Sequence, residues 1–305
     1  MSEPIAANPL LALSRQLQQL AEATAGSIVS VRSHGRSIAS GFVWKPGFVV
    51  TASDALEADD EISVIAAGDG SIEAQLVGRD PTTDIAVLRL AEDLNVAVPA
   101  TASEAVLVGQ MVLALGRGRE GTIAGLGCVA VAGGAWQSRR GGRIDKLIRL
   151  DLRLDRQAEG GIVVDGEGRM LGMPVFGPRR RPLIIPMATI EAVAPKLLAD
   201  GRIRRGYLGI GVHPVQLDEA LAAAHALPDR RAAMVVSVDP DGAAGKAGVL
   251  LGDIIVSFDG EPVTGLRSLF ARLSPDSVGK GVELKLLRGG QTASANVTIG
   301  ASPAP

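Results

Sequence analysis

The pattern of apolar and polar residues changes three times along this chain. Near the start, residues 9–24 repeat leucine at helical spacing from Leu10 to Leu20 with polar residues between, which predicts an amphipathic helix. From residue 25 onward, short β-branched runs such as SIVSVRS and DIAVLRL are broken by Gly, Pro and Asp. Many short strands at nearly regular spacing favour an antiparallel barrel or sandwich over a parallel sheet.

The later part of the chain has a mixed pattern. Residues 189–199 place apolar side chains on one helical face, and the run ADGRIRRG then reads as a linker. After it, helices near residues 217–226 and 266–273 alternate with strands such as MVVSV and DIIVSF. We therefore divide the chain into an N-terminal helical segment (1–24), a β-rich domain (25–200), a linker (201–205), a mixed domain (206–300) and a tail (301–305).

Composition narrows the class of protein. The 305 residues suffice for two domains, and a net charge of −2 gives no case for nucleic acid or an anionic membrane as main partner. No apolar run approaches the ~20 residues that span a bilayer. Cys128 is the only cysteine, and the three histidines lack metal-ligand spacing, so we predict no disulfide, metal or cofactor.

The first residues, MSEPIAANPL, lack a basic leader followed by an apolar stretch and a cleavage site. This pattern predicts a cytoplasmic protein, or a periplasmic one if the sequence lacks its natural start.

Several segments are similar to the HtrA/Deg serine proteases. They are GFVWKPGFVVTASDAL, RDPTTDIAVL, LIRLDLRLDRQAEGGIVVDGEGRMLGM, RGYLGIGV and PDGAAGKAGVLLGDIIVSFDGEPV, which together extend over most of the chain. The resemblance implies a mainly β fold, with a trypsin-like double six-stranded β-barrel followed by an α+β PDZ domain. It also implies a serine endopeptidase family, with a homotrimer as candidate assembly.

The family's catalytic motifs carry unusual residues in this sequence. The family's V-T-x-x-H pattern, threaded onto the run VTASD, puts Asp54 at the histidine position, while RDPTTDIAVL keeps Asp84 at the aspartate position. The N-P-G-N-S-G-G motif matches residues 155–161, with Glu159 at the serine and Gln157 at the glycine whose amide helps build the oxyanion hole. Because the mechanism needs a nucleophilic hydroxyl and a base, we interpret the chain as a proteolytically inactive pseudoprotease.

The fold would bring these three carboxylates near one another, where they repel. The residues leave three alternatives. The carboxylates pair with arginines such as Arg149, Arg153 or Arg156 or are solvated, they bind a divalent cation, or they perform acid–base hydrolysis. We favour arginine pairing over a cation, since no familiar Ca²⁺ loop spacing occurs.

The PDZ-like segment keeps its expected ligand-binding residues. A PDZ domain adds an extended peptide to a sheet edge and holds its terminal carboxylate in backbone amides. The predicted carboxylate loop is Tyr207, Leu208, Gly209 and Ile210, and the predicted groove wall is Leu266, Leu269 and Phe270.

The function predicted from these motifs is a C-terminus-binding adaptor or chaperone-like scaffold in protein quality control, whose partners are protein or peptide C-termini. The alternatives are an active HtrA-family endopeptidase or hydrolase with a rearranged carboxylate site, and a purely structural assembly platform.

Overall fold

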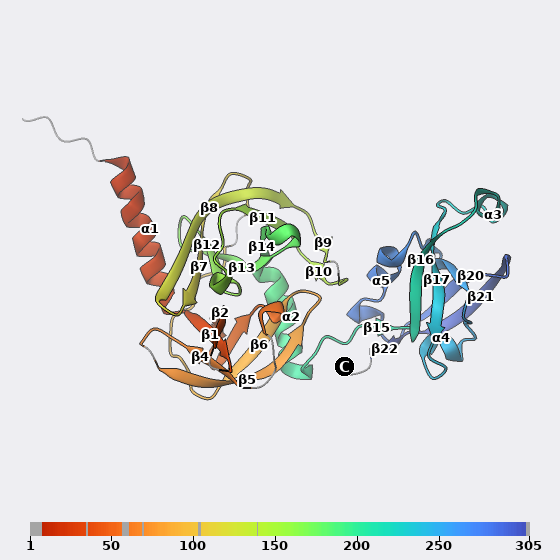
Figure 1. The fold of residues 1–305 in the computed structure, drawn as a ribbon, viewed down its shortest axis with the longest axis horizontal. Helices are drawn as coiled ribbons and strands as arrows, with labels where there is room; N and C mark the ends of the chain where they lie inside the picture. Colours follow the sequence, from red (N-terminus) through yellow and green to blue (C-terminus); the bar gives the residue numbers. More distant parts are fainter. Residues whose placement is uncertain are drawn as a thin grey trace, which may run out of the picture. The chain divides into compact units, whose positions relative to one another are not determined.

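The computed structural model describes residues 8–302 except 35, 57–60, 69, 103–104 and 139. The chain divides into two compact units, residues 1–203 and 204–305 (Figure 1). Each unit has its own hydrophobic core, and each is described by itself below.

The first unit begins its β structure with a closed barrel. In the described residues, six antiparallel strands close in the order β1-β2-β3-β6-β5-β4. Its most apolar strands are buried, as in β6, where five of six side chains are buried. The bounds are β1 Ile28–Ser33, β2 Arg36–Lys45, β3 Phe48–Thr51, β4 Ile62–Ile65, β5 Ser71–Asp80 and β6 Ile85–Leu90.

A second closed barrel follows in the same unit. Its described strands close in the order β11-β14-β13-β12-β7-β8, and the short hairpin β9–β10 lies between β8 and β11 in sequence. The bounds are β7 Met111–Gly118, β8 Gly121–Gly133, β9 Trp136–Gln137, β10 Arg143–Ile144, β11 Leu147–Asp151, β12 Ile162–Asp165, β13 Met170–Phe176 and β14 Pro182–Pro186. The predicted trypsin-like double barrel is thus confirmed.

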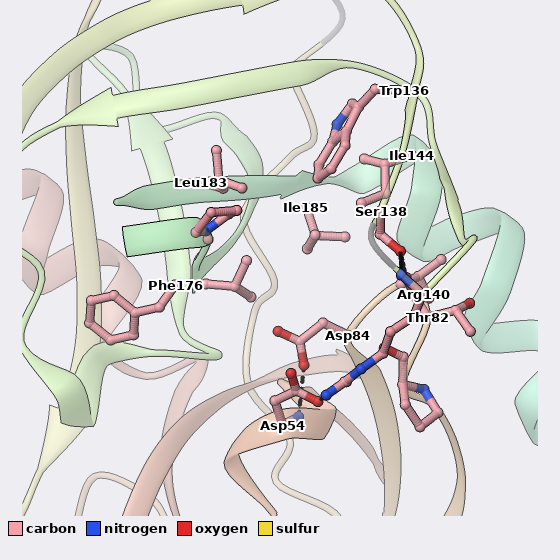
Figure 2. A pocket seen from close by; sticks show the side chains of 15 residues that line it. Asp54, Thr82, Asp84, Trp136, Ser138, Arg140, Ile144, Phe176, Leu183 and Ile185 are labelled. Carbon is pink, nitrogen blue, oxygen red and sulfur yellow. Dashed lines mark hydrogen bonds and ion pairs between the residues drawn. The ribbon is translucent and has the colours of Figure 1, made fainter. Parts of the chain in front are cut away.

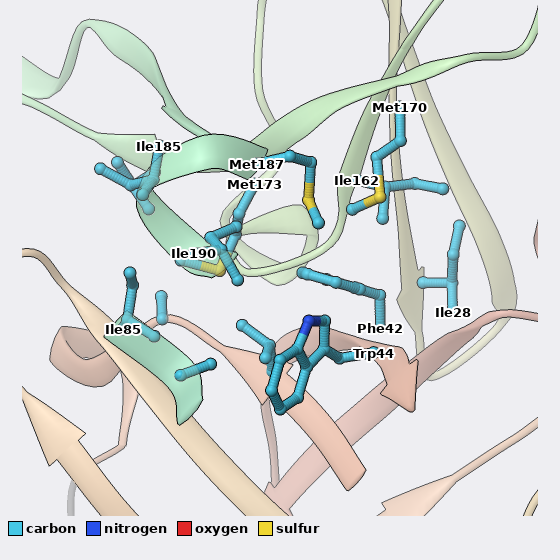
Figure 3. Packing of buried hydrophobic residues seen from close by; sticks show 14 of the residues in the cluster. Ile28, Phe42, Trp44, Ile85, Ile162, Met170, Met173, Ile185, Met187 and Ile190 are labelled. Atoms are coloured by element: carbon cyan, nitrogen blue, oxygen red, sulfur yellow. The ribbon is translucent and has the colours of Figure 1, made fainter. Parts of the chain in front are cut away.

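One apolar cluster joins the two barrels. It combines Phe42 and Trp44 of the first barrel with Ile162 and Met173 of the second, and Ile190 of helix α2 (Met187–Asp200) packs against both (Figure 3). Figure 3 shows these side chains meeting between strands that are far apart in sequence. The barrels therefore share a core, and the cleft between them has fixed walls.

Helix α1 (Pro9–Ala25) forms where an amphipathic helix was predicted. The Asn8 side chain caps it by accepting the amide of Leu10 at 3.1 Å. Only its second half packs as predicted, since Leu17 and Leu20 contact the shared core while Leu10 is 76% exposed.

The second unit is an α+β domain built on one antiparallel sheet. The order β16-β17-β18-β20-β21 leaves β16 at an edge, and β15 pairs separately with β22. This pairing extends to residue 301, which the sequence analysis had placed in the tail. The bounds are β15 Gly206–Tyr207, β16 Ile210–Gln216, α3 Glu219–Ala224, β17 Arg231–Val238, α4 Ala243–Lys246, β18 Ile254–Phe258, β19 Glu261–Pro262, α5 Leu266–Arg272, β20 Gly281–Arg288, β21 Gln291–Thr298 and β22 Gly300–Ala301.

Phe42→Ala tests the shared core. Phe42 is 1% exposed, so we expect the free energy of unfolding of the first unit to fall by about 3–5 kcal/mol. Both tryptophans, Trp44 and Trp136, lie in this unit, so fluorescence during urea denaturation reports on it. The control Leu107→Ala removes a side chain that is 66% exposed and should change little. Equal losses in the two variants would contradict a shared core.

Candidate functional site

A cavity of about 240 Å³ lies in the first unit (Figure 2). Elements of both barrels contribute to its walls, and most of its wall surface is apolar. The described residues that line it are Asp54, Pro81, Thr82, Thr83, Asp84, Trp136, Ser138, Arg140, Ile144, Val175, Phe176, Gly177, Pro178, Leu183 and Ile185. Two of the three predicted carboxylates, Asp54 and Asp84, are therefore in one cavity.

Asp84 lies directly before β6, with a left-handed backbone (φ 60°). Its Oδ1 accepts the amide of Asp54 at 2.7 Å, and its carbonyl accepts the amide of Ser53 at 3.3 Å. Burial raises the pKa of Asp84 to about 7, against the lowering effect of the Asp54 amide, and the negative charges of Asp54 and Glu159 raise it further. Asp84 thus changes its protonation near neutral pH.

Asp54 pairs with Arg140, a residue that the sequence analysis did not single out. Asp54 belongs to the short helical turn Ser53–Ala55, and Arg140 lies in the β9–β10 hairpin, where it also donates to the Pro81 carbonyl at 3.1 Å. Asp54 is therefore paired with an arginine, as favoured, but the partner is Arg140 and not one of the examples Arg149, Arg153 or Arg156. The hairpin brings a distant arginine to the cavity, and sequence spacing does not reveal such a contact.

Glu159 is bonded to Phe176, a residue that lines the cavity. Its Oε1 accepts the amide of Phe176 at 3.0 Å. Burial raises the pKa of Glu159, while that amide and the charges of Arg156 and Arg180 lower it. Glu159 is not among the residues that line the cavity, although its charge raises the pKa of Asp84. In the described residues no group of three or more acidic, His or Cys side chains is arranged to hold a metal ion.

In the loop that precedes Glu159, the Gln157 amide forms a hydrogen bond within the loop itself. Gln157 lies in the turn Arg156–Ala158, and its amide donates to Oδ1 of Asp155 at 2.8 Å. The Gln157 side chain accepts the amide of Arg119 at 3.3 Å, which anchors it away from the cavity. The amide that the family would direct toward an oxyanion is therefore bonded within the loop.

No histidine lines the cavity among the described residues. His34 lies between β1 and β2 and pairs with Glu61 at 2.7 Å, while His213 and His225 belong to the second unit. Ser138 is the serine in the lining, and its hydroxyl donates to the carbonyl of Thr82. The cavity thus combines carboxylates, one arginine and apolar walls.

The predicted carboxylate loop lies at the start of β16 in the second unit. The amide of Ala244 donates to the Leu208 carbonyl at 2.7 Å, and the amide of Asp239 donates to the Gly209 carbonyl at 2.8 Å. Gly209 has φ 74°, and a Cβ there would lie 2.8 Å from Cα of Gly242. Both features require glycine at this position.

The predicted groove wall is only partly exposed. Helix α5 contacts β16, the edge strand. Leu269 is 1% exposed and belongs to the core, so its prediction as a wall residue is corrected, because helical spacing turns it inward. Leu266 is partly buried against the same core, and Phe270 is 46% exposed. Phe270 is therefore the predicted side chain most available to a ligand.

Comparison with known proteins agrees with this architecture. The family model for a trypsin-like peptidase domain matches residues 39–173, and that for a PDZ domain matches residues 206–299. A "Probable periplasmic serine endoprotease DegP-like" from Brucella suis biovar 1 (strain 1330) is 31% identical over 283 residues, covering 88% of this chain and 54% of the relative. Its counterpart from Halomonas elongata is 31% identical over 281 residues, covering 88% and 57%.

Solved structures have the same fold. The serine endoprotease from Yersinia pestis superposes with a TM-score of 0.72 at 25% identity, covering 99% of this chain and 100% of that one. The HtrA-type protease AlgW with decapeptide gives a TM-score of 0.72 at 22% identity, covering 95% and 99%.

The two units are thus a trypsin-like peptidase domain and a PDZ domain in one chain. The chain belongs to a serine endopeptidase family, with an HtrA/DegP-type trypsin-like serine protease domain followed by a PDZ domain. It spans about half the length of the curated relatives that it matches.

The cytoplasmic prediction is wrong. The relatives from Brucella suis and Halomonas elongata are named periplasmic endoproteases, which points to the periplasm. The prediction relied on the composition of the first residues alone. Among the described helices, none is long and apolar enough to cross a membrane.

Asp84→Asn tests the protonation of the cavity. Because the pKa of Asp84 is raised to about 7 from its ordinary value of 3.8, the ionised group lowers stability above pH 7, and this cost disappears as pH falls toward 4. Asparagine tolerates the left-handed backbone and cannot ionise. We expect the variant to melt a few degrees higher than the parent chain at pH 8, with no gain near pH 4.

The matched control is Asp259→Asn, which changes an exposed aspartate with the same left-handed backbone in the second unit. Thermal melts from pH 4 to pH 8 measure both variants. A gain at pH 8 that also appears for Asp259→Asn, or none for Asp84→Asn, would argue against a buried, protonated Asp84.

Proposed function

We propose that this chain binds the C-termini of polypeptides through its PDZ domain and does not cleave peptide bonds. The observation that carries the proposal is the geometry of the loop Tyr207–Ile210. We also propose that this chain is periplasmic, because the names of its relatives place them in that compartment.

The hydrogen bonds of the loop's carbonyl groups indicate which way its N–H groups point, and this direction suits carboxylate binding. The carbonyls of Leu208 and Gly209 are held by Ala244 and Asp239. In a trans peptide unit the carbonyl and the following N–H point in opposite directions. The N–H groups of Gly209 and Ile210 therefore point away from these partners, as an anion-binding nest requires.

The free edge of the sheet is where we propose that the rest of the peptide binds. Strand β16 has a partner, β17, on one side only within the described sheet, so its other side can accept an added strand. Helix α5 contacts β16 and carries Phe270, which gives the groove an apolar wall. The HtrA-type protease AlgW was solved with a decapeptide, so an extended peptide is a ligand that suits this fold.

Inactivity is supported by the residues at three motif positions. Asp54 stands at the family's histidine position and Glu159 at its serine position, and neither supplies the imidazole or the hydroxyl of the mechanism. The amide of Gln157 is bonded to Asp155 rather than available to an oxyanion. The alternative, a hydrolase that uses the carboxylates, is addressed by the next experiment. The homotrimer stays a prediction.

The purified chain should not hydrolyse casein or other unfolded substrates, because it lacks a nucleophile–base pair. Loss of triad groups lowers turnover by about 10⁴–10⁶-fold, which places any residual activity at background. A serine-directed fluorophosphonate should leave the protein unlabelled. Turnover that copurifies with the chain and disappears in Glu159→Ala would instead establish a carboxylate-based hydrolase.

The PDZ domain should bind free peptide C-termini that end in an apolar residue. We expect a micromolar Kd, about −8 kcal/mol, measured by calorimetric titration. Amidating the peptide C-terminus removes the recognised charge and should weaken binding about tenfold or more.

Two glycine variants locate this site. Gly209→Val should weaken peptide binding, because the left-handed backbone and the close approach of Gly242 both exclude a β-branched side chain. The control Gly281→Val places the same side chain on β20, where a Cβ meets no atom within 4 Å, and should bind normally. Equal binding of free-acid and amidated peptides would show that the loop is not a carboxylate site.

A further inference from the structure

The cavity of the first unit has an apolar wall and a polar side that includes the carboxyl groups of Asp54 and Asp84. The side chains of Ile144, Val175, Leu183 and Ile185 line it, together with the ring of Trp136. At about 240 Å³ it has several times the ~30 Å³ that one water occupies in the liquid. Such a volume, lined mostly by apolar surface, suits an aliphatic chain of several carbons.

On the polar side, the carboxyl group of Asp84 is the one that has no ion pair among the described residues. Its Oδ1 accepts the amide of Asp54, whereas Oδ2 has no hydrogen-bond partner among the described residues. Figure 2 shows this carboxyl group facing the cavity below Ile185, with Asp54 and Arg140 beside it. One carboxylate oxygen is thus available to a group that enters the cavity.

From this arrangement we infer that the cavity is a binding site for a primary alkylammonium group, presented by a lysine side chain of a bound polypeptide. The aliphatic stem would contact the apolar wall, and the ammonium would donate to Oδ2 of Asp84. The inference does not depend on peptide binding by the PDZ domain.

Charge complementarity favours a cation over other ligands. Among the described residues, the charged groups that act on Asp84 are Asp54, Glu159 and Arg140, so two of these three are negative. Arg140 already pairs with Asp54, and within the part of the chain that the structure describes Asp84 has no ion-pair partner of its own. A buried carboxylate without a partner is costly, and an entering ammonium would supply the positive charge that pairs with it.

The same geometry favours lysine over arginine. A guanidinium binds a carboxylate best through two parallel hydrogen bonds, which need both oxygens. Oδ1 of Asp84 is occupied by the Asp54 amide, so only one oxygen remains. A compact ammonium needs only one.

Protonation gives the site a defined pH dependence. In the empty cavity burial raises the pKa of Asp84 to about 7, and an ammonium binds only the ionised carboxylate. Lysine binding should therefore weaken about tenfold between pH 8 and pH 6, as the ionised fraction falls from about nine-tenths to one-tenth. A ligand that accepts a hydrogen bond from protonated Asp84 would show the opposite dependence.

The experiment uses the full chain and acetylated, C-terminally amidated tripeptides that carry lysine, norleucine, arginine or glutamate in the middle position. Amidation removes the carboxylate that the PDZ loop is proposed to bind. Binding is followed through the indole N–H signals of Trp136, which lines the cavity, and Trp44, which is buried in the core and serves as internal reference. These are the only tryptophans.

We expect the lysine peptide to shift the Trp136 signal alone, with a Kd at pH 8 at least about tenfold lower than those of the other three peptides. Asp84→Asn should remove both the lysine preference and the pH dependence, while Asp259→Asn should keep both. Equal affinity for lysine and norleucine, stronger binding of glutamate or arginine, tighter binding at pH 6, or no shift of Trp136 would each overturn the inference.

Arg140→Gln provides a second variant whose side chain is half exposed and whose loss should not unfold the barrel. It frees the Asp54 carboxylate, so lysine binding at pH 8 should tighten severalfold. Weaker lysine binding in this folded variant would contradict the proposed role of the carboxylates.

Discussion

The apolar cluster shared by the two barrels is the constraint on which the cleft depends. Phe42 and Trp44 on one side and Ile162 and Met173 on the other exclude water from the interface, and α2 closes it. Because each barrel completes the core of the other, neither can move without exposing apolar surface. The loops that carry Asp84 and the β9–β10 hairpin are thereby fixed relative to each other without any metal or disulfide among the described residues.

A rigid cleft explains how a carboxyl group can stay buried there. The Asp84 main chain is left-handed, a strained conformation for a residue with a side chain. The amide of Asp54 offsets part of the cost of burying the Asp84 carboxylate, and the raised pKa of Asp84 reflects the remaining cost. Strain and unpaired charge at one position are typical of sites retained for binding or chemistry.

The sequence predicted the fold well and the cleft incompletely. Strand periodicity indicated an antiparallel barrel or sandwich, whereas the double barrel and the position of Asp84 were implied by the family resemblance that motifs such as RDPTTDIAVL carry. Arg140 and Trp136 were missed, because the hairpin that carries them has strands of only two residues each, and its path cannot be read from spacing. Leu269 was misassigned because a helix adjoining a groove also packs on a core, and apolar spacing does not separate the two faces.

The two units present opposite solutions to ligand recognition. In the PDZ loop, the carbonyls of Leu208 and Gly209 are held by Ala244 and Asp239, and the amides of Gly209 and Ile210 on the opposite side form the site that we propose for a carboxylate. In the peptidase cleft, a buried side chain offers one negative oxygen at the end of an apolar cavity. A polypeptide has both complementary groups, a terminal carboxylate and lysine ammoniums. Because an amidated peptide lacks the first and a norleucine peptide lacks the second, the two sites can be measured separately in one intact chain.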